Sequence, residues 1–319
     1  MRIFKNINTY QQTQQPLWVT IGTFDGMHLG HQYLIEQMLE YSQKVHEHPR
    51  TMIITFDIHP QTYFAANSPR PIMTNRHKIQ YIEKTGIDDC LMMNFDEKLS
   101  KISAEQFIEE YLVKKLQISG IVIGFNNTFG YQGRGNIKLL KRYAMKNNFT
   151  ALTAKPFYIE DSPVSSSRIR EILKTGMLAG AKKLLGRYFS VLGIVIKGVQ
   201  RGRKLGIPTA NIKMDISFLP PLGVYGVKVL GIDEKQYFGV ANIGYNPTFH
   251  INNPDSMKPQ LEVIVFDFNS NLYGKELTIE FITRIRDEIK FDSLDKLISG
   301  IQSDIEKFRI YTSKNLADC

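Results

Sequence analysis

Short apolar runs alternate with amphipathic segments through the first half of the chain. The residues of each run are apolar and partly β-branched, which is typical of strands buried in a parallel sheet. Strands are therefore expected at 17–21, 52–56, 90–93 and 121–124. Ahead of the last strand, Ser103 and Gln106 form a capping-box pattern for a helix. Its apolar face is expected to comprise Phe107, Ile108, Tyr111, Leu112 and Leu116. The alternation predicts an α/β domain with a parallel sheet and helical crossovers.

The pattern changes after about Gly186, where short β-rich runs are separated by Gly, Pro and Asn. Strands are expected at 189–196, 224–230, 237–241, 261–266 and 277–282. Such a series predicts a small antiparallel barrel. A closing helix is expected after Asp292 and Ser293, with an apolar stripe of Leu294, Leu297, Ile298, Ile301, Ile305 and Phe308. We therefore expect two domains, residues 1–186 and residues 187–319.

Composition agrees with two domains and excludes several classes of protein. A chain of 319 residues is long enough for two domains with separate cores. The only cysteines are Cys90 and Cys319, which excludes a disulfide framework and a CxxC metal knuckle. No targeting signal and no apolar run of about 20 residues is present, so we expect a cytoplasmic protein without a membrane role.

The formal net charge of +9 has two interpretations. Lysine and arginine are spread along the chain, with no long basic run and no basic-aromatic repeat. Nucleic-acid binding as the main role is therefore not expected, and polyphosphate substrates explain the surplus equally well. Weak self-association is left open.

The first candidate site is the segment 22–31, GTFDGMHLGH, which joins a predicted strand to a predicted helix. Its glycines allow tight turns, and unpaired N–H groups at a helix N-terminus favour an anion. The segment therefore predicts a phosphate site, with His28 and His31 beside the phosphates. A zinc site is the competing interpretation, but zinc usually needs three or four ligands and Asp25 is the only obvious third. A purely structural turn is the other alternative.

Other loops of the same half carry complementary groups, as expected where parallel strands end. Asp57 and His59 follow the strand at 52–56, and the segment GFNNTFG, 124–130, follows the strand at 121–124. The segment SSSRIR, 165–170, is the stronger signal, because hydroxyls and an arginine at a helix start can bind phosphate oxygens together. The alternative is a serine cap followed by a surface arginine.

A second candidate site comes from the glycine- and lysine-rich segment 193–211, GIVIKGVQRGRKLGIPTAN. Its loop can surround phosphates, while Thr209 and Asn211 offer neutral oxygens to Mg²⁺. A basic hairpin with a structural turn would look similar. Glu262 favours the first interpretation, because it is a lone carboxylate in an otherwise apolar strand and could act as a general base on an alcohol.

The motifs GTFDGMHLGH, TFDIHP, GFNNTFG and SSSRIR together resemble the adenylyltransferase module of prokaryotic bifunctional riboflavin kinase/FAD synthetases. This resemblance implies a Rossmann-like nucleotidyltransferase domain in which His28 and His31 stabilise charge on the ATP phosphates. The remaining contacts that it implies are to ATP, from Gly22, Phe24, Asp25, Gly30, Asn126, Ser165, Ser166 and Arg168, and to FMN, from Asp57, His59 and Phe129. Asn127 departs from the family, whose members often carry phenylalanine there.

The segments PTAN (208–211), GVYGV (223–227), NIGYNPTF (242–249), DFNSNLYG (267–274) and RIRDEIKF (284–291) resemble the riboflavin kinase module of the same family. This resemblance implies Mg²⁺ and ATP binding through Thr209 and Asn211, and deprotonation of riboflavin by Glu262. The other implied contacts are Gly198, Arg203, Lys204 and Gly206 to ATP, and Arg286, Glu288 and Phe291 to the flavin.

The resemblance as a whole implies that riboflavin is converted to FMN and then to FAD by one chain. Three alternatives are left open at this point. The chain could retain only one of the two activities, adenylylate another phosphate substrate, or be a non-catalytic flavin or nucleotide sensor.

Overall fold

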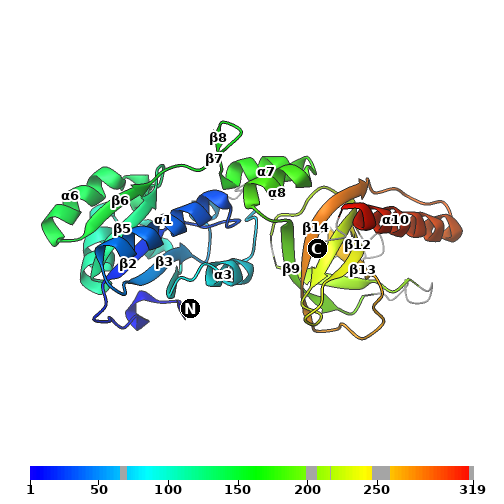
Figure 1. Ribbon diagram of the computed structural model, residues 1–319, viewed down its shortest axis with the longest axis horizontal. Helices are drawn as coiled ribbons and strands as arrows, with labels where there is room; N and C mark the ends of the chain where they lie inside the picture. Colours follow the sequence, from blue (N-terminus) through cyan, green and yellow to red (C-terminus); the bar gives the residue numbers. More distant parts are fainter. Residues whose placement is uncertain (65–69, 199–206, 216, 246–258, 316–319) are drawn as a thin grey trace. The chain divides into compact units, whose positions relative to one another are not determined.

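The computed structural model describes residues 1–64, 70–198, 207–215, 217–245 and 259–315. The chain divides into two compact units, Met1–Ser166 and Ser167–Cys319. Figure 1 shows an α/β unit in blue to green and a β-barrel unit in green to red. The expected boundary at residue 186 stays a prediction. Among the described residues, no helix is both long enough and apolar enough to cross a membrane.

The first unit is built on a six-stranded parallel sheet with the order β1-β4-β3-β2-β5-β6. Its strands are β1 (Arg2–Phe4), β2 (Leu17–Ile21), β3 (Arg50–Phe56), β4 (Asp89–Met93), β5 (Ile118–Gly124) and β6 (Thr150–Ala154). Its longer helices are α1 (Leu29–Val45), α3 (Asn75–Glu83), a π-helix η2 (Phe107–Lys115) and α6 (Ile137–Asn147). Shorter elements are η1 (Ile7–Thr9), α2 (Pro60–Phe64), α4 (Glu97–Ser100), α5 (Ala104–Gln106), η3 (Tyr131–Gly133) and the hairpin β7 (Tyr158–Ile159) with β8 (Ser162–Pro163). The predicted α/β class is confirmed.

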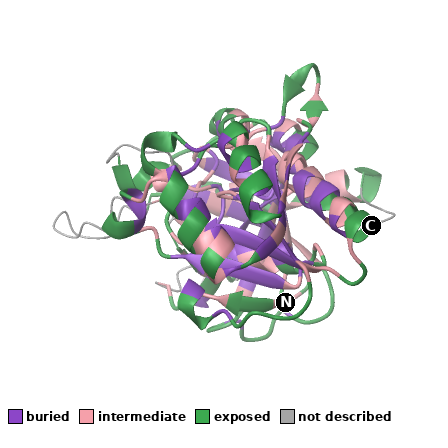
Figure 2. Cartoon of the chain, turned by 90° about the vertical axis from the view of Figure 1, so that its left-hand side faces the viewer, coloured by how far each residue is buried: buried purple, intermediate pink, exposed green. Residues whose placement is uncertain are grey.

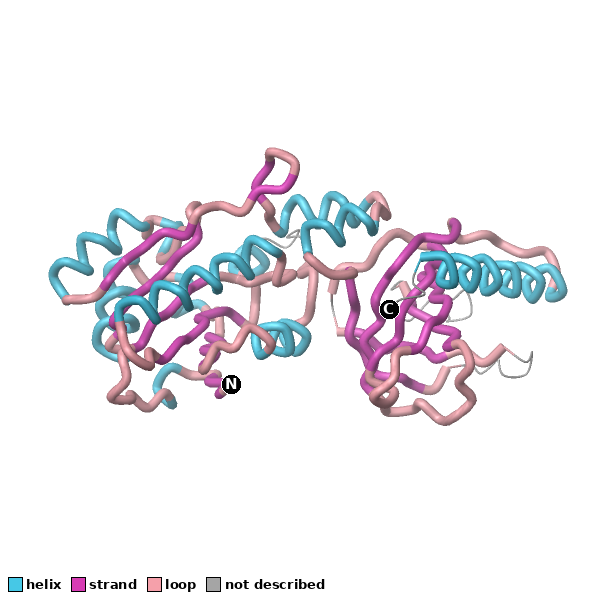
Figure 3. Tube along the Cα trace, viewed as in Figure 1, coloured by secondary structure: helices cyan, strands magenta, loops and turns pink. Residues whose placement is uncertain are grey.

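Both faces of this sheet are covered, which explains the continuous apolar runs. In β2, Leu17, Val19 and Ile21 pack into the core shared with η2 and α6, while Trp18 packs into the core shared with α1. Helices flank the magenta strands in Figure 3, and the strands in Figure 2 are mostly purple, that is, buried. Alternate residues therefore face different cores, and no polar position is needed along the strand.

The helix expected after Ser103 is present, with a difference in its form. Ser103 and Gln106 make the reciprocal capping-box hydrogen bonds at 3.0 and 3.1 Å. The helix begins as α5 and continues as the π-helix η2, in which Phe107, Ile108 and Leu112 are buried. The edge strands β1 and β6 are not among the predicted strands, because both carry polar residues and are incompletely buried, and β1 has only three residues.

The second unit contains a closed antiparallel barrel with the order β10-β13-β12-β11-β14-β9. Its strands are β9 (Phe189–Ile196), β10 (Ala210–Met214), β11 (Gly223–Leu230), β12 (Tyr237–Gly244), β13 (Gln260–Val265) and β14 (Glu276–Arg286). Helices α7 (Ser166–Lys174) and α8 (Leu178–Leu185) precede the barrel, and α10 (Leu294–Asn315) follows it. The C-terminal helix packs through Phe308 against Val240 and Phe266. The predicted barrel and closing helix are confirmed.

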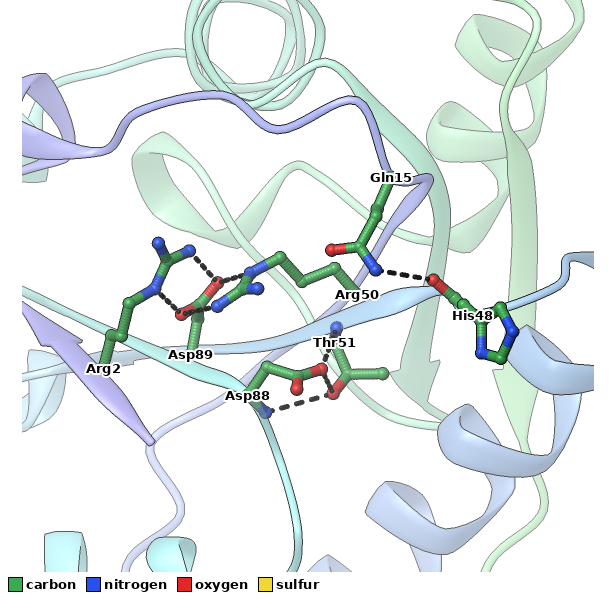
Figure 4. A network of polar contacts seen from close by, with 7 residues as sticks. All are labelled: Arg2, Gln15, His48, Arg50, Thr51, Asp88 and Asp89. Atoms are coloured by element: carbon green, nitrogen blue, oxygen red, sulfur yellow. Dashed lines mark hydrogen bonds and ion pairs between the residues drawn. The ribbon is translucent and has the colours of Figure 1, made fainter.

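A cluster of charges closes the amino-terminal edge of the parallel sheet, away from the strand ends that carry the candidate site (Figure 4). Asp89 is fully buried and accepts hydrogen bonds from Arg2 at 2.8 and 3.1 Å and from Arg50 at 2.6 and 2.9 Å. Burial alone would raise the pKa of Asp89, but these two guanidinium groups outweigh it and lower the pKa below the ordinary value. The group therefore links β1, β3 and β4.

We expect the substitution Asp89→Asn to destabilise the first unit by about 3 kcal/mol, because it leaves two guanidinium groups without their anion. The folded-state pKa of Asp89 is lowered, so its contribution is present above the ordinary carboxyl pKa and is lost as pH falls through the folded value. Urea unfolding of both proteins at pH 7 and pH 3 checks this. A difference at pH 7 that persists undiminished at pH 3 would contradict it.

Candidate active sites

The turn from β2 to α1 is held in an unusual backbone conformation. Phe24, Gly26 and Met27 have positive φ angles of 49°, 81° and 40°. Phe24 and Met27 are nevertheless almost completely buried. Left-handed backbone at residues other than glycine is costly and is found mainly where the surrounding structure enforces it, often at functional sites. This turn directs the chain from the end of a buried strand to the first residue of α1.

His28 is the N-cap of α1 and is 5% exposed. Its Nδ1 atom accepts a hydrogen bond of 3.3 Å from the backbone N–H of His31. Because Nδ1 accepts, the proton of the neutral ring lies on Nε2. The two imidazole rings stack with centroids 3.7 Å apart, and a Cβ on Gly30 would lie only 3.2 Å from the His28 ring. Residue 30 therefore has little room for a side chain.

Asp25 stabilises this turn through hydrogen bonds, and Phe24 stabilises it through packing. The Asp25 carboxylate accepts backbone N–H bonds from Ile72 at 2.8 Å and Met73 at 3.4 Å. The Ser166 hydroxyl donates to the backbone oxygen of Asp25 at 2.8 Å. The centroids of the Phe24 and His31 rings are 5.2 Å apart, and a Cβ on Gly22 would lie 3.3 Å from the Phe24 ring. The Phe24 side chain thus belongs to the core rather than to an open surface.

The loop after β3 is organised by Asp57. Its carboxylate accepts N–H bonds from Ile58 at 2.7 Å and Phe95 at 2.9 Å. The His59 ring accepts from the N–H of Gln61 at 3.2 Å, at the start of α2. Beside this loop lies an aromatic group that the sequence motifs did not reveal, with ring centroids 5.4 to 6.0 Å apart: Phe56, Tyr63, Phe64 and Phe95. Tyr63 and Phe64 are exposed, so the group has an open apolar face.

The loop after β5 places its residues in different surroundings. Asn126 is exposed, whereas Phe129 is buried and packs against Phe107 with ring centroids 5.7 Å apart. Asn127, the departure from the family pattern, donates from its side-chain amide to the backbone oxygen of Ile21. It thereby connects this loop to the end of β2. Ser165 is partly buried ahead of α7, and Arg168 is in α7, within the second unit.

In the barrel, a cavity of about 490 Å³ opens beside the start of β10. Thr209 and Ala210 line it together with Val263 of β13 and the segment from Phe268 to Tyr273. Its walls are apolar with several amide and hydroxyl groups, a combination typical of small-molecule sites. The segment 268–273 belongs to the DFNSNLYG motif, but the residues alone did not indicate that it walls a cavity.

Glu262 lies on the opposite face of the same strands. It is paired in register with Asn211 of β10 on one side and Asn242 of β12 on the other, and paired residues of antiparallel strands share a face. Burial raises the pKa of the Glu262 carboxyl above its ordinary value. A half-buried carboxylate between two amides is suited to accept a proton.

The segment after β14 lies close to Asn242, the register partner of Glu262. A Cβ on Gly244 would collide with the Glu288 carboxylate and would lie 3.0 Å from the Asn242 amide, so glycine lets Glu288 come close to Asn242. Arg286 is bound to the buried Asp304 of α10 by hydrogen bonds of 2.7 to 3.0 Å, and its guanidinium lies 5.6 Å from the centre of the Phe291 ring. Arg286 therefore anchors this segment to α10.

Gly198, where the described part of the glycine-rich segment ends, lies directly against the Asn211 amide. A Cβ at this position would collide with that amide group. The predicted ATP contacts Arg203, Lys204 and Gly206 lie outside the described residues. Among the described residues, no group of three or more His, Cys, Asp or Glu side chains could hold a metal ion.

From the resemblance to riboflavin kinases, we expect Gly198→Ala to lower kcat/KM for flavin phosphorylation by about tenfold or more, because the added methyl group displaces the Asn211 side chain from beside Glu262. Steady-state rates with riboflavin as the varied substrate check this. Adenylylation of supplied FMN by the same protein serves as the control and should stay within twofold. An unchanged phosphorylation rate would contradict the placement of Asn211.

Comparison with known proteins assigns both halves of the chain. The FAD synthetase family model matches residues 10–168, and the riboflavin kinase family model matches residues 185–312. A relative from Buchnera aphidicola subsp. Schizaphis graminum, named bifunctional riboflavin kinase/FMN adenylyltransferase, is 37% identical over 313 residues, which cover 98% of this chain and 99% of the relative. A relative of the same name from Escherichia coli (strain K12) is 34% identical over 306 residues, which cover 95% and 96%.

A solved structure shares the whole architecture. The crystal structure of a protein named a macrolide-efflux protein from Streptococcus pneumoniae matches with a TM-score of 0.81 and 30% sequence identity, and covers 96% of this chain and 98% of its own. The two family matches lie one after the other along the chain, and the two relatives and this structure each match nearly its whole length. The chain belongs to the family of bifunctional riboflavin kinases/FMN adenylyltransferases.

Proposed function

We propose that this chain makes FAD from riboflavin in two steps. The barrel transfers the γ-phosphoryl group of ATP to riboflavin and gives FMN and ADP. The α/β unit then joins the adenylyl group of a second ATP to FMN and releases pyrophosphate. The observation that carries the proposal is that one chain contains both a histidine-capped helix start after an inner strand of a parallel sheet and, in a barrel with a cavity, a half-buried carboxylate between two asparagines. Residues 1–186 are assigned to the adenylyl step, and residues 187–319 to the kinase step.

In the kinase step, Glu262 accepts the proton of the riboflavin 5′-hydroxyl as that oxygen attacks the γ-phosphorus. Its raised pKa favours this role, because a carboxylate that holds a proton more strongly is the better base once ionised. ATP has one end at the cavity lined by Thr209 and its phosphates beside Gly198 and Asn211, on the face that carries Glu262. The contacts assigned to the flavin are Arg286, Glu288 and Phe291.

ATP enters both reactions as its Mg²⁺ complex. Thr209 and Asn211 supply neutral oxygens, which suit a cation that keeps water and phosphate oxygens as its other ligands. A group rich in carboxylates is not required for an ion that arrives bound to its nucleotide. Bound Mg²⁺ neutralises charge on the transferring phosphoryl group.

In the adenylyl step, the FMN phosphate attacks the α-phosphorus of ATP and the bond to the β-phosphate breaks. A phosphate dianion needs no general base, so the site has to position two anions and stabilise their charge. The Nε2–H group of His28 and the N-terminus of α1 provide donors for this purpose. His31, Asn126, Ser165, Ser166 and Arg168 are assigned to the ATP phosphates. Asp57, His59 and the exposed rings of Tyr63 and Phe64 are assigned to the FMN side, and Phe129 supports that loop from the core.

Incubation of the purified protein with riboflavin, ATP and Mg²⁺, followed by chromatographic separation of the flavins, tests the proposal. We expect FMN to appear first and FAD to accumulate with equivalent pyrophosphate. FMN without FAD would reduce the function to a kinase, and no flavin product would contradict both assignments. Because both steps consume ATP, we propose that the protein is cytoplasmic.

A further inference from the structure

Lys78 has surroundings that are unusual for a lysine. It lies in α3 and is 6% exposed, whereas lysine side chains normally keep their ammonium group in water. Its Nζ atom donates three hydrogen bonds, to the backbone oxygens of Thr23 at 3.2 Å and Phe56 at 2.9 Å and to the Thr55 hydroxyl at 3.2 Å. All three donors of the ammonium group are therefore used on neutral oxygens.

These acceptors lie where two strands of the sheet separate. The last ladder contact between β2 and β3 is the hydrogen bond of 3.1 Å from the Gly22 N–H to the Ile54 oxygen. Beyond this hydrogen bond the two segments diverge. The segment after β2 continues through Thr23 to the turn of His28, and the segment after β3 continues through Phe56 to the loop of Asp57. The Thr55 hydroxyl and the Lys78 ammonium bridge the gap, since Thr55 also donates to the Thr23 oxygen at 3.2 Å.

The two segments joined in this way carry the two reactants in the proposed function. The turn of His28 is assigned to ATP, and the loop of Asp57 to FMN. We propose that Lys78 is a positioning residue for adenylyl transfer. Its hydrogen bonds set the spacing between the turn of His28, which is assigned to ATP, and the loop of Asp57, which is assigned to FMN. The inference rests on the proposed function, and it concerns geometry, because the buried Lys78 ammonium group directs all three of its donors to oxygens of the protein.

The protonation state of Lys78 predicts how the rate of FAD formation depends on pH. Burial lowers its pKa to about 8, while the neighbouring Asp25 and Asp57 carboxylates and the Cys90 side chain oppose that shift. Burial raises the pKa of the Cys90 thiol to about 11, so the thiol stays neutral when Lys78 titrates. Below pH 8 the ammonium group offers three donors to three acceptors, and above pH 8 the amine offers only two. FAD formation should therefore fall as pH rises through about 8.

The test compares the two activities of one protein from pH 7 to pH 9.5. In the unaltered chain we expect the rate of FAD formation from FMN to fall about tenfold with an apparent pKa near 8, while riboflavin phosphorylation does not follow that curve. A flat profile for FAD formation would overturn the proposal. If the protein makes no FAD at pH 7, the proposed function itself has failed rather than the role of Lys78.

Substitution supplies a second, independent measurement. Lys78→Met keeps the length of the side chain and removes its donors, and Lys84→Met alters an exposed lysine just beyond the same helix as a matched control. We expect Lys78→Met to lower kcat for FAD formation by about 10- to 100-fold at pH 7, with riboflavin phosphorylation within twofold of the control. The fall in rate above pH 8 should also disappear. FAD formation within twofold of the control would overturn the proposal. If Lys78→Met fails to fold, the profile of the unaltered chain decides.

Discussion

Glu262→Gln is expected to lower kcat for riboflavin phosphorylation by about 10²- to 10⁴-fold, while the same protein converts supplied FMN to FAD at the normal rate. The substitution keeps the shape of the side chain and its position between Asn211 and Asn242. It removes the group that accepts the hydroxyl proton, and the magnitude is that of a positioned general base. Single-turnover phosphorylation, with flavins separated by chromatography, measures the loss.

The structure also indicates that this variant folds. Burial raises the pKa of Glu262, so keeping the carboxylate ionised at neutral pH costs stability. A neutral glutamine removes that cost, and the midpoint of thermal unfolding should not fall. Glu280→Gln alters another partly buried carboxylate of the same barrel, in β14, and should leave phosphorylation within a few-fold of normal. Equal losses in both variants would argue against a specific role for Glu262.

His28→Ala is expected to give the opposite result, a loss of FAD formation by about 10²- to 10³-fold with riboflavin phosphorylation unchanged. The substitution removes the Nε2–H donor and also the N-cap acceptor for the His31 N–H. Loss of one preorganised donor at a site of developing charge has this magnitude. The rate of pyrophosphate release with saturating FMN and ATP is the measurement.

The loss of the N-cap has to be separated from the loss of the donor. His28→Asn keeps a capping side chain, because asparagine is a favoured N-cap residue, but it does not place a donor where the imidazole Nε2 lies. We expect the asparagine variant to recover thermal stability without recovering activity. His48→Ala, at an exposed histidine just beyond α1, controls for the general effect of removing an imidazole. Full activity in His28→Asn would contradict the assigned role.

The sequence predicted the elements whose pattern is set by burial. Runs such as 17–21 and 189–196 are apolar because the fold covers them, and the structure has strands with those bounds. The edge strand β1 was missed because Arg2 faces solvent and the charged cluster around Asp89, which no local pattern predicts. The boundary of the closing helix followed from Ser293 and the apolar stripe.

The candidate site residues come from motifs that carry their chemistry in adjacent residues, and their roles stay predictions, whereas the surroundings of each side chain depend on packing. Phe24 and Phe129 are in the right loops, but their rings are buried, so proximity in sequence did not distinguish contact from support. Lys78 was missed because a lysine in a polar helix normally faces water, and only the three-dimensional structure places its ammonium group under two loops. The cavity beside Thr209 is likewise formed by a segment some sixty residues away in the sequence.

The two sites of the chain are expected to be linked only by FMN, which the kinase step makes and the adenylyl step uses. Mixing the Glu262→Gln and His28→Ala proteins, each purified, with riboflavin, ATP and Mg²⁺ tests this most directly. Neither variant alone should produce FAD from riboflavin, and the mixture should produce it, because FMN released by the His28→Ala protein is adenylylated by the Glu262→Gln protein. A mixture that forms no FAD, or a single variant that makes FAD from riboflavin at the normal rate, would contradict the account.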